Sequence, residues 1–219
     1  MQLAFLHIPK TGGRTIINLC KQFYDEQECA TVRTLRQPYE MTTKFAAGHF
    51  PYDILPPHHM RRVFTILRDP AQRTVSHYQM TLSYNPEQWE QYDLFWKHDV
   101  PMDILEFAND DILKSGMVKN AMVRQLVGRD LFLQDTPVQS HHVEIAIQNL
   151  QSLLVGFIDN YDSFVERLCK VMGWNKPTDY PILNQSKPYH ISNNILEEIR
   201  AINQWDIILY DWAKENLSG

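Results

Sequence analysis

The sequence has little that would cross-link the chain, anchor it in a membrane or bind a metal. Its 219 residues include three cysteines, and none of them forms a Cys-x-x-Cys pair. This small, odd number predicts reduced thiols in a cytoplasmic protein. No apolar run approaches the ~18 residues of a membrane span, and the N-terminus does not resemble a signal peptide. The sequence also lacks HExxH and paired CxxC patterns, so we expect no metal.

Positive charge is also in short supply. Lysine and arginine number 21 against 26 aspartates and glutamates, which gives a net charge of -5. This balance argues against a general nucleic-acid binder and, more weakly, against a long, heavily sulfated polymer as substrate. With 44% hydrophobic residues the chain can bury a proper core. Its length suits one domain over residues 1–219.

Short apolar segments alternate with stretches of helical spacing along the chain. Strands are predicted at Leu3–Ile8, Lys44–Phe50, Arg61–Asp69 and Leu153–Phe157. Helices are predicted from near Arg14, from Pro70, and over residues 103–109, 117–127, 138–151, 162–172 and 193–216. The alternation predicts an α/β fold, a three-layer, P-loop-like sandwich with a mostly parallel central sheet flanked by helices.

The segment HIPKTGGRTI, which follows the first predicted strand, has the composition of an anion-binding loop. Gly12 and Gly13 let the backbone close around an anion, while Lys10, Arg14 and Thr15 add positive charge and donors. The lysine precedes the glycines, unlike the GxxxxGK[ST] order of nucleotide-hydrolysing P-loops. The alternative is a tight strand–helix turn with a surface lysine.

A second candidate site lies in ILRDPAQRTVSHY. Arg68, at a predicted strand end, can grip a phosphate through two hydrogen bonds, and Ser76 lies about two helical turns further on. The alternative pairs Arg68 with Asp69 locally and leaves Ser76 solvated. Lys10, His49 and Arg68 all follow predicted strands, at the sheet edge where α/β proteins bind ligands.

Together the two segments resemble the sulfotransferases that use 3′-phosphoadenosine 5′-phosphosulfate (PAPS). KTGGRT is similar to their 5′-phosphosulfate loop, and the arginine and serine of RDP…R…SHY are similar to their 3′-phosphate site. The carbohydrate branch, which includes the heparan sulfate 2-O- and 6-O-sulfotransferases, matches best. AGHFPYDI, KNAMVRQLVG and LNQSKPY resemble further segments of that branch. The missing membrane anchor and stem would suit a soluble member of the bacterial type.

The resemblance implies a role for each candidate residue. His49 would be the catalytic base and Lys10 would neutralise the oxygen between phosphorus and sulfur, with PAPS as co-substrate and no metal. The nucleotide would contact residues of three segments: Lys10, Thr11, Gly12, Gly13, Arg14 and Thr15; Arg68 and Ser76; and, by loop position alone, Ser186 and Lys187.

The acceptor is less defined than the nucleotide. The resemblance favours a hydroxylated saccharide or glycoconjugate. Asn120 and Arg124 lie four residues apart on one helix face, and would bind the acceptor if that face lined the cleft or do nothing if it faced solvent. His7, beside the loop, is interpreted as a packed structural residue. The rival functions are an ATP-dependent phosphotransferase of the P-loop type and a non-catalytic nucleotide-binding protein of the same fold.

Overall fold

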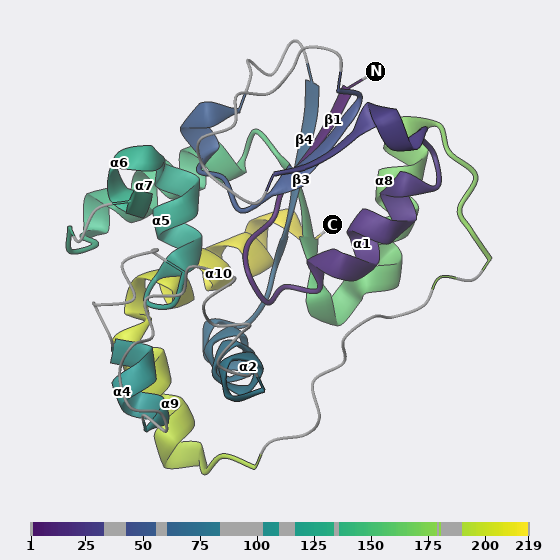
Figure 1. Ribbon diagram of the computed structural model, residues 1–219. Helices are drawn as coiled ribbons and strands as arrows, with labels where there is room; N and C mark the ends of the chain where they lie inside the picture. Colours follow the sequence, from purple (N-terminus) through teal and green to yellow (C-terminus); the bar gives the residue numbers. More distant parts are fainter. Residues whose placement is uncertain are drawn as a thin grey trace.

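The computed structural model has three layers, with a sheet between two sets of helices (Figure 1). It describes residues 2–32, 43–55, 61–83, 103–109, 117–133, 136–178, 180 and 190–218. The strands of these residues are β1 (Gln2–Leu6), β2 (Cys29–Val32), β3 (Phe45–Gly48), β4 (Arg61–Leu67) and β5 (Leu154–Phe157). They form one sheet in the order β2-β3-β1-β4-β5, in which every neighbouring pair is parallel.

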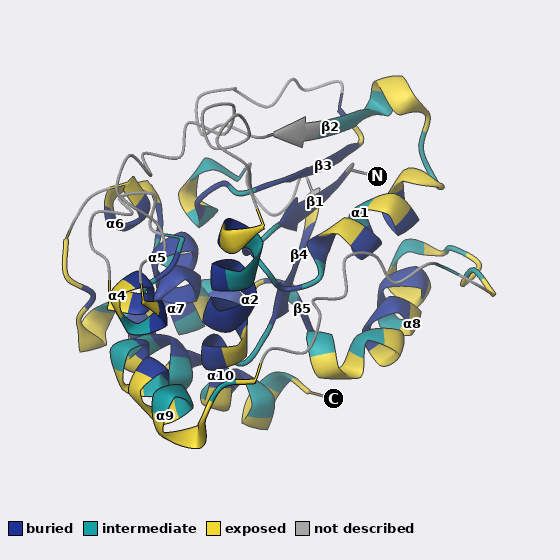
Figure 2. Ribbon diagram, turned by 60° about the horizontal axis from the view of Figure 1, so that its bottom comes forward, coloured by how far each residue is buried: buried dark blue, intermediate teal, exposed yellow. Residues whose placement is uncertain are grey.

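Alternate residues of the central strands point into two different cores, which explains the continuous apolar character of these strands. In β1, Leu3 and Phe5 pack against helices α1 (Gly13–Lys21) and α8 (Tyr161–Met172). Ala4 and Leu6 of the same strand face the opposite helical layer. Figure 2 shows the central strands as dark blue and the outer faces of α1 and α8 as yellow.

The opposite layer contains α5 (Ala121–Val127), α6 (Arg129–Leu133), α7 (Ser140–Leu150) and α10 (Gln204–Leu217). A smaller apolar cluster joins α2 (Pro70–Leu82), α4 (Ile104–Asn109) and α9 (Asn193–Ile202) beside it. Short 3₁₀ turns lie at Glu26–Glu28, Tyr52–Ile54 and Ile158–Asn160. The predicted α/β sandwich with a parallel sheet is therefore confirmed.

The structure also differs from the sequence-based expectations at several elements. The edge strand β2 was not predicted, and its four residues pair with β3 alone. The predicted C-terminal helix is two helices that meet at Asn203. Leu82, at the end of α2, keeps the helical spacing of the buried Val75 and Tyr78 but is 40% exposed.

Candidate nucleotide and acceptor site

Three candidate residues meet where adjacent strands β3, β1 and β4 end. Lys10 lies in the loop after β1, while His49 and Arg68 directly follow β3 and β4. Arg68 Nη1 donates a hydrogen bond to the Lys10 carbonyl oxygen at 3.1 Å. His49 Nδ1 lies 2.7 Å from the carbonyl oxygen of His7, just after β1. The parallel sheet thus gathers two cations and a histidine at one edge, as strand ends in α/β folds do.

The loop between β1 and α1 has the backbone of an anion site. Lys10 and Gly12 both adopt positive φ angles, of 69° and 82°. The Thr11 hydroxyl donates to the Ile8 carbonyl oxygen at 2.8 Å and closes the loop on itself. Helix α1 begins at Gly13 with no acidic residue in its first turn and no side-chain cap. Its first N–H groups and the positive end of its dipole therefore remain suited to an anion.

Two aromatic rings hold this loop from either side. A Cβ atom added to Gly13 would lie 2.0 Å from His7 Nε2, so the His7 ring occupies the space that any other residue at position 13 would need. From α8, the Tyr161 hydroxyl donates to the Gly12 carbonyl oxygen at 3.3 Å. The side chain of Thr15 also hydrogen-bonds to Tyr161. The hydroxyl of Thr11 thus bonds within the loop, and that of Thr15 bonds to its support on α8.

The electrostatics of the site favour a bound anion. Burial, followed by repulsion from Arg68 and Arg14, lowers the pKa of Lys10 from 10.5 to about 8. Like charges near one another disfavour the protonated lysine, and a phosphate among them would reverse that effect. The loop is therefore arranged for a ligand that brings negative charge.

His49 is held in one tautomer by its bond to the His7 carbonyl oxygen. Because a carbonyl oxygen only accepts, His49 Nδ1 must carry the proton in its bond to His7, so Nε2 holds the lone pair in the neutral ring. Burial, opposed by this hydrogen bond and aided by Lys10, lowers the pKa of His49 below 6.5. The ring is partly exposed. A neutral imidazole with a free lone pair is the form that a general base requires.

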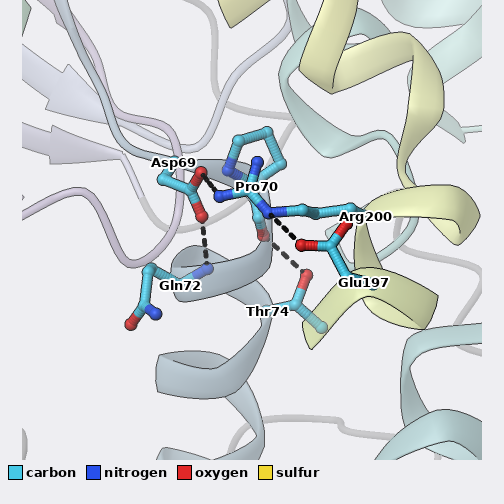
Figure 3. Close-up of polar contacts among 6 residues, drawn as sticks. All are labelled: Asp69, Pro70, Gln72, Thr74, Glu197 and Arg200. Carbon is cyan, nitrogen blue, oxygen red and sulfur yellow. Dashed lines mark hydrogen bonds and ion pairs between the residues drawn. The ribbon is translucent and has the colours of Figure 1, made fainter. Parts of the chain in front are cut away.

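Asp69 binds the start of helix α2 and Arg200 of α9 (Figure 3). Its Oδ1 accepts from the Gln72 backbone N–H at 2.9 Å, so Asp69 is the N-cap of α2, with proline at the first helical position. Its Oδ2 accepts from Arg200 Nη2 of α9 at 2.6 Å. Both carboxylate oxygens of Asp69 thus bond to groups other than Arg68, which speaks against the alternative of a local Arg68–Asp69 ion pair. Arg68 instead reaches across to the Lys10 loop.

Ser76 lies on α2 and is only 3% exposed, so the alternative of a solvated position is wrong. Its neighbour Arg73 is fully buried, and the Arg73 guanidinium donates to the carbonyl oxygens of Met117, at 2.9 Å, and Val118. This face of α2 therefore fixes the segment before α5. Ser186 and Lys187 lie outside the described residues.

Asn120 and Arg124 do not face solvent, which rules out that alternative, and their role toward the acceptor stays a prediction. They are 4% and 7% exposed. Asn120 Oδ1 accepts from the backbone N–H groups of Trp205 and Asp206 at 3.2 Å each. Arg124 donates to the carbonyl oxygens of Lys119 and Leu131 at 3.2 and 3.0 Å. Asn120, the residue before α5, thus joins the start of this helix to α10, and Arg124 joins α5 to Leu131 of α6.

Two residues that contact the site were missed in the sequence. Gln125 is fully buried on α5 and donates to the carbonyl oxygens of His7 and Phe50. Tyr161 supports the glycine loop from α8. A glutamine inside the apolar run AMVRQLV was a signal for the first, whereas nothing local marks a tyrosine that acts 149 residues away.

Comparison with known proteins finds a sequence similarity over part of the chain and a loose structural similarity. No family model matches the chain. A segment is 34% identical over 86 residues to a protein-tyrosine sulfotransferase of Arabidopsis thaliana, which is 36% of this chain and 17% of the plant protein. The mouse sulfotransferase SULT7A1, solved in complex with PAP, matches with a TM-score of 0.45 and 13% identity over 94% of this chain and 66% of that one. That likeness is too loose to add to the argument. The plant match supports a relationship with the sulfotransferase superfamily and offers nothing for the carbohydrate branch.

The described residues also bear on membranes and metals. Within them, no helix combines the length and apolar character needed to cross a bilayer. The same part of the chain contains no group of three or more His, Cys, Asp or Glu side chains placed to hold a metal ion.

Proposed function

We propose that this protein transfers a sulfonate group from PAPS to a hydroxyl of an acceptor. The observation that carries the proposal is the meeting of Lys10, Arg68 and His49 at adjacent strand ends, with His49 held in the tautomer of a base. The partial similarity to a plant sulfotransferase supports it.

The residues present fit the nucleotide. The N-terminus of α1, Lys10 and Arg14 form one positive region for the 5′-phosphosulfate. Arg68 adds a planar, charged donor suited to the 3′-phosphate, and its bond to the Lys10 carbonyl oxygen keeps the two phosphate sites adjacent. A nucleotide with phosphates at both positions would use both sites, whereas ADP would use one.

The reaction is an in-line displacement at sulfur, comparable to phosphoryl transfer. His49 Nε2 accepts the proton of the acceptor hydroxyl while the hydroxyl oxygen bonds to sulfur. The bond between sulfur and the bridging phosphate oxygen breaks with its electron pair, and Lys10 stabilises the charge that develops on that oxygen. The products are a sulfate ester and adenosine 3′,5′-bisphosphate, with the proton on His49 later passing to water.

For the acceptor we propose a saccharide or glycoconjugate hydroxyl, on the resemblance of the Gly48–His49 segment and its neighbours to carbohydrate sulfotransferases. The name of the plant relative makes a tyrosine side chain the competing acceptor. Incubating the protein with ³⁵S-labelled PAPS and either a panel of oligosaccharides or tyrosine-containing acidic peptides separates the two. Label on peptides alone would overturn the saccharide assignment and leave sulfonate transfer standing.

The general-base assignment is tested on whichever acceptor works. A positioned base contributes ~10²–10⁴-fold in rate, so we expect His49→Ala to lower kcat by about that factor. Binding of adenosine 3′,5′-bisphosphate should not change, which serves as the folding control. Wild-type kcat in His49→Ala would remove this residue from the mechanism.

A further inference from the structure

Gln125 joins the ends of the two strands that flank the proposed base. Its Nε2 lies 3.1 Å from the carbonyl oxygen of His7, after β1, and 3.0 Å from that of Phe50, after β3. Because a carbonyl only accepts, the NH₂ group must face both oxygens and the amide orientation is settled. The second bond holds the residue directly after His49 in the chain.

The His7 carbonyl oxygen receives two donors. Gln125 Nε2 approaches it at 3.1 Å and His49 Nδ1 at 2.7 Å. A carbonyl oxygen has two lone pairs, so Gln125 fills one and leaves the other for His49. With both lone pairs occupied, a water or any third donor does not compete with His49 for this oxygen.

The His7 ring also limits the movement of His49, because it packs against one face of the His49 ring. The two imidazoles lie 4.3 Å apart between centroids, with 32° between their planes. On its other side the His7 ring stacks on Phe5 at 5.0 Å, and it also lies against Gly13 of the phosphate loop. His49 is therefore held at Nδ1 and on one face by the same neighbouring residue.

Gln125 is placed at some cost to the fold. The residue is fully buried, and its Oε1 has no hydrogen-bond partner within the described part of the chain. A buried amide oxygen without a partner is destabilising, whereas an apolar side chain of similar size would not be. A glutamine at this position therefore serves its two N–H bonds rather than the packing of α5.

We propose that Gln125 is a positioning residue that, through the His7 carbonyl, keeps His49 in the tautomer with its proton on Nδ1 and its lone pair on Nε2. The proposal rests on the proposed function, in which that lone pair accepts the acceptor's proton. Gln125 touches neither nucleotide nor acceptor in this scheme. Its effect on turnover would pass entirely through the orientation of His49.

The test is the tautomer itself, read from ¹⁵N shifts of the His49 ring in protein with labelled histidine. We expect Nδ1–H in the wild-type protein and a mixture of tautomers in Gln125→Met, which keeps the size of the side chain and removes both donors. A reacting group displaced by ~1 Å can cost ~100-fold in rate, so kcat should fall by up to about that factor in Gln125→Met with bisphosphate binding unchanged. Gln125→Leu, which also lacks the donors, is the second variant if the first does not fold.

Asn149→Leu is the matched control. Asn149 Nδ2 donates to the carbonyl oxygen of Leu126 at 2.8 Å, and Leu126 lies beside Gln125 on α5. The variant therefore removes a side-chain amide bond to the same helix that does not involve His7. It should leave tautomer and kcat unchanged. An Nε2–H tautomer in the wild-type protein would overturn the proposal, as would an unchanged tautomer and kcat in Gln125→Met. A tautomer shift in a protein that transfers no sulfonate would refute the proposed function and keep the positioning role.

Discussion

Lys10 combines two unfavourable features at one residue. Its φ of 69° is a left-handed conformation that costs a non-glycine residue of order 1–3 kcal/mol. Its ammonium group is partly buried near Arg68 and Arg14, which lowers its pKa to about 8. Such features persist where the surrounding structure enforces them, most often at ligand sites. An anion in the loop would relieve the second of them.

The pKa of Lys10 predicts how nucleotide affinity depends on pH. Bound phosphate raises this pKa, so binding takes up a proton once the free protein has lost it. The Kd for adenosine 3′,5′-bisphosphate should therefore be flat below pH 8 and rise above it by up to ~10-fold per pH unit. Phosphate groups, with a second pKa near ~6, are already ionised in this range. Titration calorimetry of wild-type protein and Lys10→Met checks this, since the variant should bind weakly with no such rise. A rise of equal size in Lys10→Met would assign it to another group.

Gly13 makes a second prediction at this scale. Its Cβ atom, if present, would lie 2.0 Å from His7 Nε2, so Gly13→Ala should lower the free energy of unfolding by ~1–3 kcal/mol through overpacking. In His7→Ala the space is open, and adding Gly13→Ala there should cost much less. Urea unfolding of the single and double variants gives the coupling. Additive effects would mean that the His7 ring does not constrain the loop.

The sequence predicted which charged and titratable residues would lie together at the candidate site, but it did not predict the residues that surround them. Lys10, His49 and Arg68 could be grouped because each follows a strand, and parallel strands end at a common edge. Asn120 and Arg124 could not be placed, since helical spacing shows which residues share a face but not what that face packs against. Gln125 donates to backbone carbonyl oxygens of distant segments. Every residue has such an oxygen, so the residue types in the sequence do not reveal this contact.

At the scale of elements, α5 and α10 cap each other. Asn120, the N-cap of α5, accepts from two N–H groups at the start of α10. In the opposite direction, the Asp206 carboxylate of α10 accepts from the backbone N–H groups of Met122 and Val123 in α5, at 3.1 and 2.9 Å. The Asn203 side chain, between α9 and α10, accepts from the Asn120 N–H at 2.9 Å. The N-terminal groups of both helices are thus satisfied by a partner helix more than 80 residues away.

This reciprocal capping predicts strong coupling between the two helices. Asn120→Ala should lower the free energy of unfolding by ~1–3 kcal/mol, because it leaves buried N–H groups of α10 without acceptors. Asp206→Ala should do the same for α5, and the double variant should cost less than the sum by ~0.5–3 kcal/mol. Urea unfolding of the two single variants and the double variant measures this. Simple additivity would show that the two caps are independent.

Element boundaries explain most of the misjudged secondary structure. The predicted C-terminal helix breaks at Asn203 because this side chain binds the N–H of Asn120, a tertiary contact invisible in periodicity. Strand β2 is a short edge strand whose CATV sequence has no clear alternation. Strands with two buried faces, such as β1 and β4, were predictable because they are continuously apolar.

For the whole molecule, histidines with lowered pKa values predict sensitivity to acid. Burial, then Arg73 and Lys10, lowers the pKa of His77 to about 3, while His7 and His49 are lowered in the same direction. The unfolded chain binds these protons near pH 6.5 and the folded protein does not, so stability is lost as pH falls below 6.5. His77 alone should contribute about 1.4 kcal/mol per pH unit. Urea unfolding at pH 7, 6 and 5 should show a shallower loss in His77→Leu, and an identical slope would contradict the assignment.

The sandwich also brings the proposed nucleotide site and the proposed base to one edge of the sheet, so a single ligand tests the central claim. The measurement is thermal unfolding with adenosine 3′,5′-bisphosphate and, separately, with ADP with and without magnesium. At a hundred times its Kd a ligand adds about 2.7 kcal/mol, which raises the Tm of a domain of this size by about 5–10 °C. We expect that rise with the bisphosphate, a much smaller one with ADP, and none in Lys10→Met. A rise with ADP and magnesium that equals or exceeds that of the bisphosphate would indicate a phosphotransferase, and no rise with any nucleotide would contradict the proposed site.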